Sequence, residues 1–286
     1  MRLSRTAVLP AIRRPAGRTL PRGISVDFTL SIAQPSTPAP GRAPPNPPWQ
    51  AVTQPAVPSP GAGIVYLLDI DNTLLDGDRM VADLRQHLEA EFSIASAERF
   101  WSALETLRAE LGFVDYLGAL QRYRNHIERS GMDAQRLLST SAFLIDYPYA
   151  ERLYPRSLEA IRHLDRTGQT VILSDGDVAL QPRKVQRSGL WDAVDGRVLI
   201  HVHKERMLDS VKRRYPARHY VMVDDELRIL AAMKANWKEQ LTTVFLRQGS
   251  HAADPANINT HTPANITIES LDDLIDLDPA RLAPAG

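Results

Sequence analysis

The sequence of 286 residues contains no cysteine. This absence excludes disulfides, thiolate metal ligands and thiol nucleophiles, and it is typical of a reducing compartment, so we expect a cytoplasmic protein. No apolar run approaches the roughly 20 residues that a membrane-spanning helix needs. The first residues also lack the continuous apolar segment of a secretory signal, and Pro10, Pro15 and Pro21 would interrupt the amphipathic helix of a transit peptide. We therefore expect no association with a membrane.

Net charge is also missing overall, since 34 acidic side chains balance 34 basic ones. The balance hides an uneven distribution. Residues 1–63 carry seven arginines and one aspartate, which leaves a net charge of about −6 on the remaining residues. A folded domain with this charge would repel a phosphate backbone. We therefore expect no nucleic-acid partner.

Proline is dense only near the N-terminus, where 13 of the 21 prolines lie between Pro10 and Pro60. Few large apolar residues accompany these prolines, so burial of apolar surface cannot offset the entropy lost on ordering. We predict that residues 1–62 form a disordered, Pro- and Arg-rich tail. The tail is either dispensable or a tether for an anionic partner.

After residue 63, short apolar runs of the buried-strand type alternate with segments that have helical spacing. Strands joined in this way by helices run parallel and are covered by helices on both faces, which predicts an α/β fold of three layers. The predicted strands are residues 64–68, 170–173, 197–200, 220–223, 242–246 and 266–268.

A long helical segment interrupts this alternation. Between about residues 79 and 145, apolar side chains recur every three or four positions, as in Leu84, Leu88 and Phe92. We predict about four helices in this stretch. The predicted organisation is a core of residues 63–76 and 151–278, a helical insertion of residues 77–150, and a C-terminal tail of residues 279–286.

Polar side chains stand where apolar strands stop or where a helix begins. They are Asp69-Ile70-Asp71-Asn72-Thr73, Ser174, Lys204 and the Asp224-Asp225 pair. Open parallel sheets bind ligands outside the carboxyl ends of their strands. We therefore expect these distant residues to meet in one crevice.

Phosphoryl transfer needs these residue types together. Asp69 would attack phosphorus and form an aspartyl-phosphate. Asp71 would protonate the leaving oxygen and then accept a proton from the hydrolytic water. Because a carboxylate and a phosphate ester repel each other, a cation must lie between them. Mg²⁺ would be held by Asp69, the main-chain carbonyl of Asp71 and a carboxylate of the Asp224-Asp225 pair.

Further residues would hold the phosphoryl group itself. Lys204 would neutralise its charge, and Lys184 is a rival for that role. The hydroxyl of Ser174, the backbone N–H groups of Asp175 and Gly176, and the side chain of Thr73 would contact its oxygens.

These motifs resemble those of the haloacid dehalogenase superfamily. Asp69-Ile70-Asp71-Asn72-Thr73 is similar to its first motif, and Ser174, Lys204 and Asp224-Asp225 resemble its second, third and fourth motifs. The resemblance covers residues 63–278 and implies a Rossmann-like core in which residues 77–150 form an α-helical cap that closes over the substrate. It also implies that Asp225 is the metal ligand and that Asp224 supports it.

Within this superfamily, the phosphatase branch is favoured, because Asp71 supplies a proton that a halide leaving group does not need. We therefore expect a Mg²⁺-dependent hydrolase of small phosphorylated metabolites. A phosphomutase with the same residues and an inactive binding protein of the same fold remain alternatives. A signalling receiver domain is disfavoured, since its acidic pair belongs to the first strand rather than to a late one. The substrate and the oligomeric state stay open.

Overall fold

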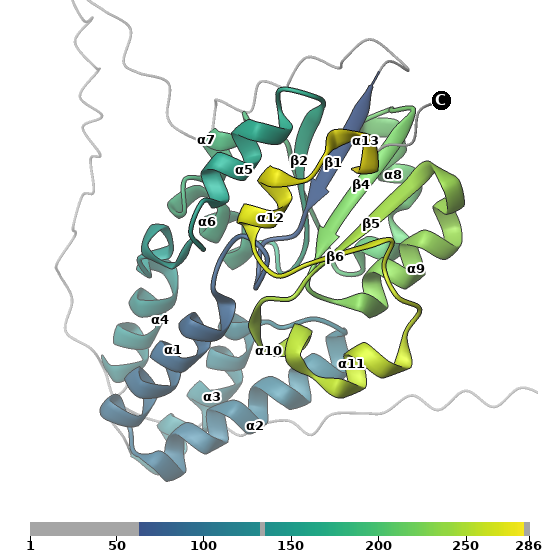
Figure 1. The fold of residues 1–286 in the computed structure, drawn as a ribbon. Helices are drawn as coiled ribbons and strands as arrows, with labels where there is room; N and C mark the ends of the chain where they lie inside the picture. Colours follow the sequence, from purple (N-terminus) through teal and green to yellow (C-terminus); the bar gives the residue numbers. More distant parts are fainter. Residues whose placement is uncertain (1–62, 132–134, 283–286) are drawn as a thin grey trace, which may run out of the picture. The chain divides into compact units, whose positions relative to one another are not determined.

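The computed structural model describes residues 63–131 and 135–282. The tail predicted for residues 1–62 lies outside these ranges. The described residues form a parallel sheet of six strands in the order β3-β2-β1-β4-β5-β6 (Figure 1). The predicted α/β class is confirmed. The strands are β1 (Ile64–Leu68), β2 (Gln169–Asp175), β3 (Val198–His201), β4 (His219–Asp224), β5 (Leu241–Leu246) and β6 (Ile266–Ile268).

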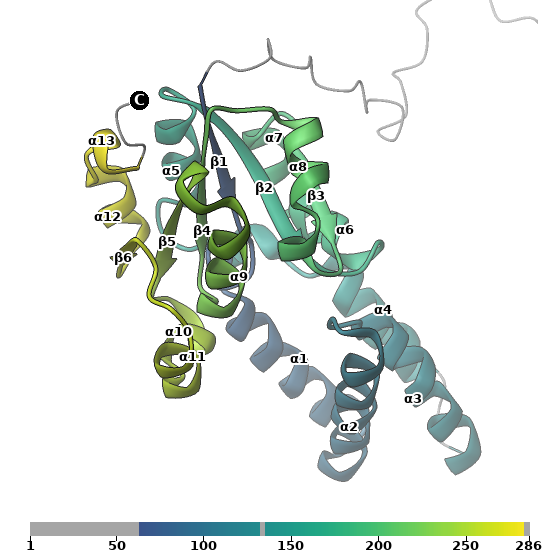
Figure 2. The ribbon, with the colours of Figure 1, turned by 90° about the vertical axis from the view of Figure 1, so that its right-hand side faces the viewer.

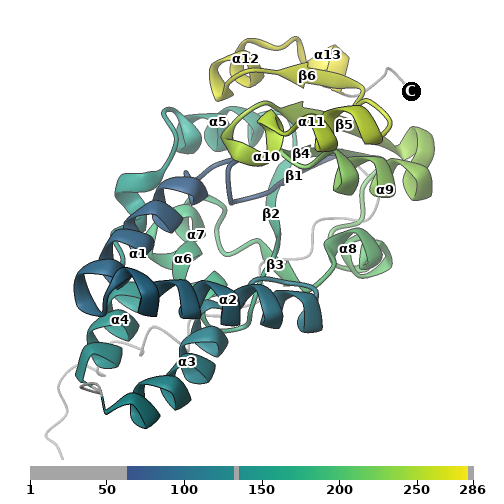
Figure 3. The same ribbon diagram turned by 90° about the horizontal axis from the view of Figure 1, so that it is seen from below.

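Both faces of the sheet are buried, which explains why its strands have continuous apolar runs. In β1, Tyr66 and Leu68 pack into one apolar cluster, whereas Val65 and Leu67 pack into the other. Helices cover the two faces separately, as Figure 3 shows. One side carries α5 (Ser157–Leu164), α6 (Leu180–Arg187), α7 (Leu190–Ala193) and α12 (Leu271–Asp276), and the other carries α8 (Leu208–Arg214) and α9 (Leu227–Trp237).

The first four helices after β1 lie beyond the carboxyl ends of the strands (Figures 1 and 2). Local sequence signals set their ends. Asp76, Ser93 and Asp115 accept backbone hydrogen bonds at helix N-termini, and Gly112 and Gly131 end two helices in the left-handed conformation. The helices are α1 (Gly77–Glu91), α2 (Ile94–Leu111), α3 (Tyr116–Ser130) and α4 (Gln135–Asp146).

The structure also contains short helices that the sequence did not predict. The segment after β5 contains α10 (Gly249–Ala253) and α11 (Pro255–Thr260), and α13 (Pro279–Leu282) lies in the predicted C-terminal tail. Each is too short for a helical period to be visible in the sequence. The described residues also form three short 3-10 helices, which are η1 (Tyr149–Arg152), η2 (Lys204–Arg206) and η3 (Lys238–Gln240). In the described ranges, no helix combines the length and apolarity needed to cross a membrane.

Candidate active site

The register of the central strands places the polar residues side by side. Leu68 pairs with Ile172 of β2 and with Val223 of β4, so these strands end at the same edge of the sheet. The residues that follow line one cavity of about 360 Å³, which also receives side chains from α1, α2 and α3. The cavity lining includes Asp69, Asp71, Ser174, Asp175, Gly176, Lys204, Asp224 and Asp225.

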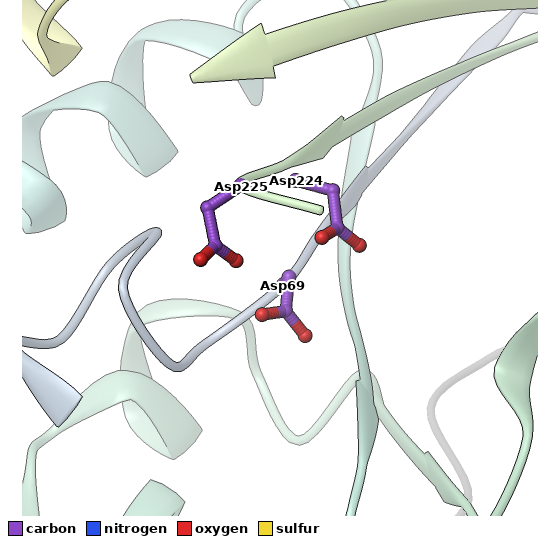
Figure 4. A group of neighbouring side chains, drawn as sticks. All are labelled: Asp69, Asp224 and Asp225. Carbon is purple, nitrogen blue, oxygen red and sulfur yellow. The ribbon is translucent and has the colours of Figure 1, made fainter. Parts of the chain in front are cut away.

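Three carboxylates crowd one wall of this cavity. Carboxylate oxygens of Asp69, Asp224 and Asp225 lie within 4.8 Å of one another, and all three residues are buried (Figure 4). Burial, together with the neighbouring acids Asp224 and Asp69, raises the pKa of Asp225 to about 9. Burial likewise raises the pKa of Asp69 to about 7, although Lys204 opposes the shift. Oxygen donors gathered in this way fit a hard divalent cation, whose charge would relieve their repulsion.

Lys204 supplies a permanent cation to the same wall. Its Nζ lies 2.5 Å from Asp69 Oδ1 and 2.7 Å from Asp224 Oδ2, and its side chain is 2% exposed. Burial by itself lowers the pKa of Lys204, but Asp224 and Asp69 raise it above its ordinary value. Lys204 therefore stays charged and holds two of the three acids in place.

Asp71 is held from helix α6 on another side of the cavity. Its two carboxylate oxygens accept hydrogen bonds from Lys184 Nζ at 2.7 and 2.8 Å. Gln181 Nε2 donates to Asp71 Oδ2 and also to Ser174 Oγ, at 3.0 Å in each case. Sequence reasoning missed Gln181. The spacing of 181 and 184, which places two polar side chains on one helix face, is the signal that could have found it.

The chain belongs to the haloacid dehalogenase-like hydrolase family. This family matches residues 65–236. A haloacid dehalogenase-like hydrolase from Burkholderia xenovorans is 60% identical, with a TM-score of 0.71 over 75% of this chain and 98% of that one.

More distant structures share the fold. The hydrolase YfnB from Bacillus subtilis, solved with bound magnesium, is 16% identical with a TM-score of 0.50, over 75% of this chain and 97% of that one. A 2-haloacid dehalogenase from Pseudomonas syringae is 17% identical with a TM-score of 0.54, over 75% and 97% of the two chains. A search of curated proteins with this chain found no match.

Two of the expected phosphate ligands, Gly176 and Thr73, are placed less favourably than the others. The N–H of Gly176 donates to the carbonyl of His201 at 2.9 Å, because β2 and β3 remain paired at this point, so that N–H is already committed. Thr73 is fully buried and its side chain does not line the cavity. Asp175 lines the cavity, and its carboxylate accepts the backbone N–H of Lys204 at 2.6 Å. The hydroxyl of Ser174 and the backbone N–H of Asp175 stay predictions for the phosphate contacts.

The turn that carries Asp71 is fixed by contacts that the sequence did not predict. Asn72 has a left-handed φ of 55°, and its Oδ1 accepts the N–H groups of Gly77 and Asp78 at 3.1 and 3.2 Å. The loop after β5 presses on this turn, since a Cβ on Gly249 would lie 2.4 Å from Asn72 Cγ. Ser250 then donates to Asp78 through its backbone N–H and its hydroxyl, at 2.6 and 2.9 Å.

The inserted helices also contribute residues to the cavity. Among the cavity-lining residues are Arg108 of α2, Tyr116 of α3 and, between them, Phe113. Burial raises the pKa of Tyr116, and the nearby carboxylate of Asp71 raises it further. Polar residues of α3 such as Arg122, Tyr123 and Arg124 do not line the cavity: Arg122 pairs with Glu110, Arg124 pairs with Glu128, and Tyr123 bonds to Ser96.

Proposed function

We propose that this hydrolase cleaves small phosphate monoesters with the help of Mg²⁺, through a phosphorylated Asp69. The observation that carries the proposal is the placement of Asp71, whose carboxylate is held in the same cavity as Asp69 by Lys184 and Gln181. An alkoxide needs a proton when it leaves, whereas a halide does not. A second carboxylate beside the nucleophile therefore favours phosphate esters over haloacids.

In the first half of the reaction, a carboxylate oxygen of Asp69 attacks phosphorus and the bond to the leaving oxygen breaks. Asp71 gives its proton to that oxygen as it departs. In the second half, water attacks the phosphorus of the aspartyl-phosphate and passes a proton to Asp71. Inorganic phosphate leaves, and both carboxyl groups return to their starting states.

The metal would bind at the acidic wall and would supply positive charge between the phosphate and the carboxylates. We propose Asp69, Asp225 and the main-chain carbonyl of Asp71 as its protein ligands. Asp224 is better suited to support, because its carboxylate already accepts the N–H of Glu226 at 2.9 Å and contacts Lys204 at 2.7 Å. The magnesium bound to the Bacillus subtilis hydrolase is in line with this choice of ion.

We propose that residues 77–150 act as a cap on a core of residues 63–76 and 151–278. Arg108, Phe113 and Tyr116 reach the cavity from this segment. The turn between α2 and α3 also touches the core closely, since a Cβ on Gly112 would lie 2.8 Å from His203 Nε2. A cover of this kind keeps bulk water away from the phosphorylated aspartate until the leaving group has gone.

The proposal is tested by supplying purified protein with Mg²⁺ and three substrate types: p-nitrophenyl phosphate, alkyl phosphates and 2-haloacids. We expect both phosphate esters to be hydrolysed, and we expect EDTA or Asp69→Asn to abolish this activity. Asp192→Asn, which changes an exposed carboxylate outside the cavity lining, is the matched control and should leave activity unchanged.

A variant of Asp71 makes the test specific for proton donation. Asp71→Asn should lower kcat on alkyl phosphates by about 10²- to 10⁴-fold. The loss should be smaller with p-nitrophenyl phosphate, because p-nitrophenolate leaves without a proton. Release of halide from 2-haloacids without any phosphatase activity would overturn the proposal.

A further inference from the structure

Gln181 is a buried amide with two partners in the proposed catalytic cavity. It lies on α6, is 5% exposed and lines the cavity. Its Nε2 donates to Asp71 Oδ2 and to Ser174 Oγ, at 3.0 Å in each case. An amide nitrogen carries two N–H groups, so these two bonds use both of them. Gln181 thus joins the proposed proton donor to an expected phosphate ligand.

The contact with Asp71 determines which way the amide of Gln181 faces. A carboxylate only accepts hydrogen bonds, so the nitrogen of the amide, and not its oxygen, must lie toward Asp71. Among the described residues, Oδ2 of Asp71 accepts from Gln181 and Lys184, whereas Oδ1 accepts from Lys184 alone. The proton of the neutral acid therefore belongs on Oδ1, which has fewer donors. The amide keeps the same orientation in both protonation states of Asp71.

The same amide nitrogen determines the direction of the Ser174 hydroxyl. Because Oγ accepts from Gln181, the proton of Ser174 must point away from the amide. Its acceptor in the structure is the carbonyl of Asp175 at 3.3 Å, which is longer than the roughly 2.5 to 3.0 Å of an ordinary hydroxyl hydrogen bond. A phosphoryl oxygen is a stronger acceptor, because it is charged. Ser174 is therefore arranged to donate its proton to a phosphoryl group.

Close packing holds Gln181 in this position as well. A Cβ on Gly176 would lie 2.7 Å from Cγ of Gln181 and 2.8 Å from its Cβ. These distances leave no room for a side chain at residue 176, so the loop after β2 packs directly on α6. Burial also makes a lost partner costly, because a buried amide has no water to bond instead. The amide therefore has little freedom to turn away from Asp71 and Ser174.

We propose that Gln181 is a positioning residue that links proton donation to phosphate binding in this hydrolase. Asp71 sets the direction of the amide, and the amide sets Ser174 as a donor toward the phosphoryl group. The inference rests on the proposed phosphatase function. It gives one neutral side chain on α6 a part in both the recognition of phosphate and the departure of the leaving group.

Binding of inorganic phosphate to the Mg²⁺-loaded protein, measured by calorimetry, tests the link to Ser174. Gln181→Met keeps the volume of the side chain but removes both donors. It should raise the Kd for phosphate by about 3- to 10-fold, the effect of one lost hydrogen bond. Gln181→Glu, which keeps the shape but turns an oxygen toward each partner, should raise the Kd at least as much. In a Ser174→Ala background, Gln181→Met should change the Kd by less than about 2-fold, since no hydroxyl remains to be oriented.

Steady-state kinetics tests the link to Asp71. Gln181→Met should lower kcat on alkyl phosphates by about 10- to 100-fold, because the proton donor is less precisely placed. The loss should be smaller with p-nitrophenyl phosphate, whose leaving group needs no proton, whereas a merely structural defect would lower both rates equally. Gln186→Met changes an exposed glutamine of α6 outside the cavity lining. This matched control should leave the Kd and kcat unchanged.

Three results would overturn the inference. The first is an unchanged Kd for phosphate in both Gln181 variants, and the second is an effect of Gln181→Met that persists in full in the Ser174→Ala background. The third is an equal loss of rate on the two kinds of ester. Failure of the proposed function would look different, since the unaltered protein would then hydrolyse neither ester.

Discussion

Lys204 Nζ lies 2.5 Å from Oδ1 of Asp69, although 135 positions separate the two residues in the sequence. Asp69 ends the strand β1 in the middle of the sheet, and Lys204 follows the edge strand β3. Their contact therefore depends on correct pairing of β1 with β2 and of β2 with β3. Because Lys204 is buried between two acids, removal of its charge would leave Asp69 and Asp224 without their counter-charge.

Lys204→Met should destabilise the metal-free protein and nearly abolish activity. Removing one partner of a buried ion pair costs about 3 to 5 kcal/mol, and Asp69 and Asp224 would both lose their counter-charge here. Urea denaturation at neutral pH measures the loss, with Lys238→Met as the control for removal of an exposed lysine. A free energy of unfolding within about 1 kcal/mol of the unaltered protein would contradict the role assigned to this contact.

The second prediction concerns pH in the absence of metal. The pKa values of Asp69 and Asp225 are about 7 and about 9, far above the ordinary value of 3.8, because burial disfavours their charged forms. The folded state therefore binds these protons more tightly than the unfolded state. The stability that this provides is complete below about pH 4 and is lost as the pH rises through 7 and then 9.

Urea denaturation in EDTA at about pH 6 and about pH 9 checks this sign. We expect stability to fall by about 1 kcal/mol per pH unit. Asp225→Asn should reduce the slope, because it removes the carboxyl group with the higher pKa. Stability that increases with pH across this interval would show that burial does not raise the pKa values of these acids.

The third prediction concerns the loop that supports the turn of Asp71. A Cβ on Gly249 would meet Asn72 Cγ at 2.4 Å, and the φ of Gly249 is also left-handed, at 72°. Gly249→Ala should therefore cost about 2 to 4 kcal/mol of stability and lower kcat, because the turn of Asp71 must move. The measurements are urea denaturation and steady-state kinetics.

Gly131 provides a matched control for this substitution. Its φ is 69°, close to that of Gly249, but an added Cβ would meet nothing within 4 Å. Gly131→Ala should cost only the conformational part, about 1 kcal/mol, and should leave kcat unchanged. Equal effects of the two substitutions would mean that the contact with Asn72 does not matter.

The sheet and the acidic wall could be predicted from the sequence because both depend on local signals. Continuous apolar runs such as residues 64–68 predict doubly buried strands, and parallel strands bring their carboxyl ends to one edge. Asp69, Ser174 and Asp225 stand directly at such ends. Their meeting therefore follows from topology alone, without knowledge of any side-chain contact.

The rest of the site depends on contacts that no local pattern encodes. Asp71 is held by Lys184, 113 positions away, and no local pattern shows that these two residues meet. The N–H of Gly176 already donates to His201, because the pairing between β2 and β3 extends to this point. The role of Gly249 depends on how the loop after β5 meets the turn of Asn72.

The central claim is that Asp69 carries the phosphoryl group during turnover, and trapping that species tests it most directly. Asp71→Asn protein is mixed with p-nitrophenyl phosphate and Mg²⁺, quenched in acid, digested and examined by mass spectrometry. The good leaving group lets the first step proceed, whereas loss of the base slows attack by water. We predict phosphate on Asp69 in the quenched protein. Release of p-nitrophenol with no phosphorylated peptide, or with phosphate on another residue, would contradict the account.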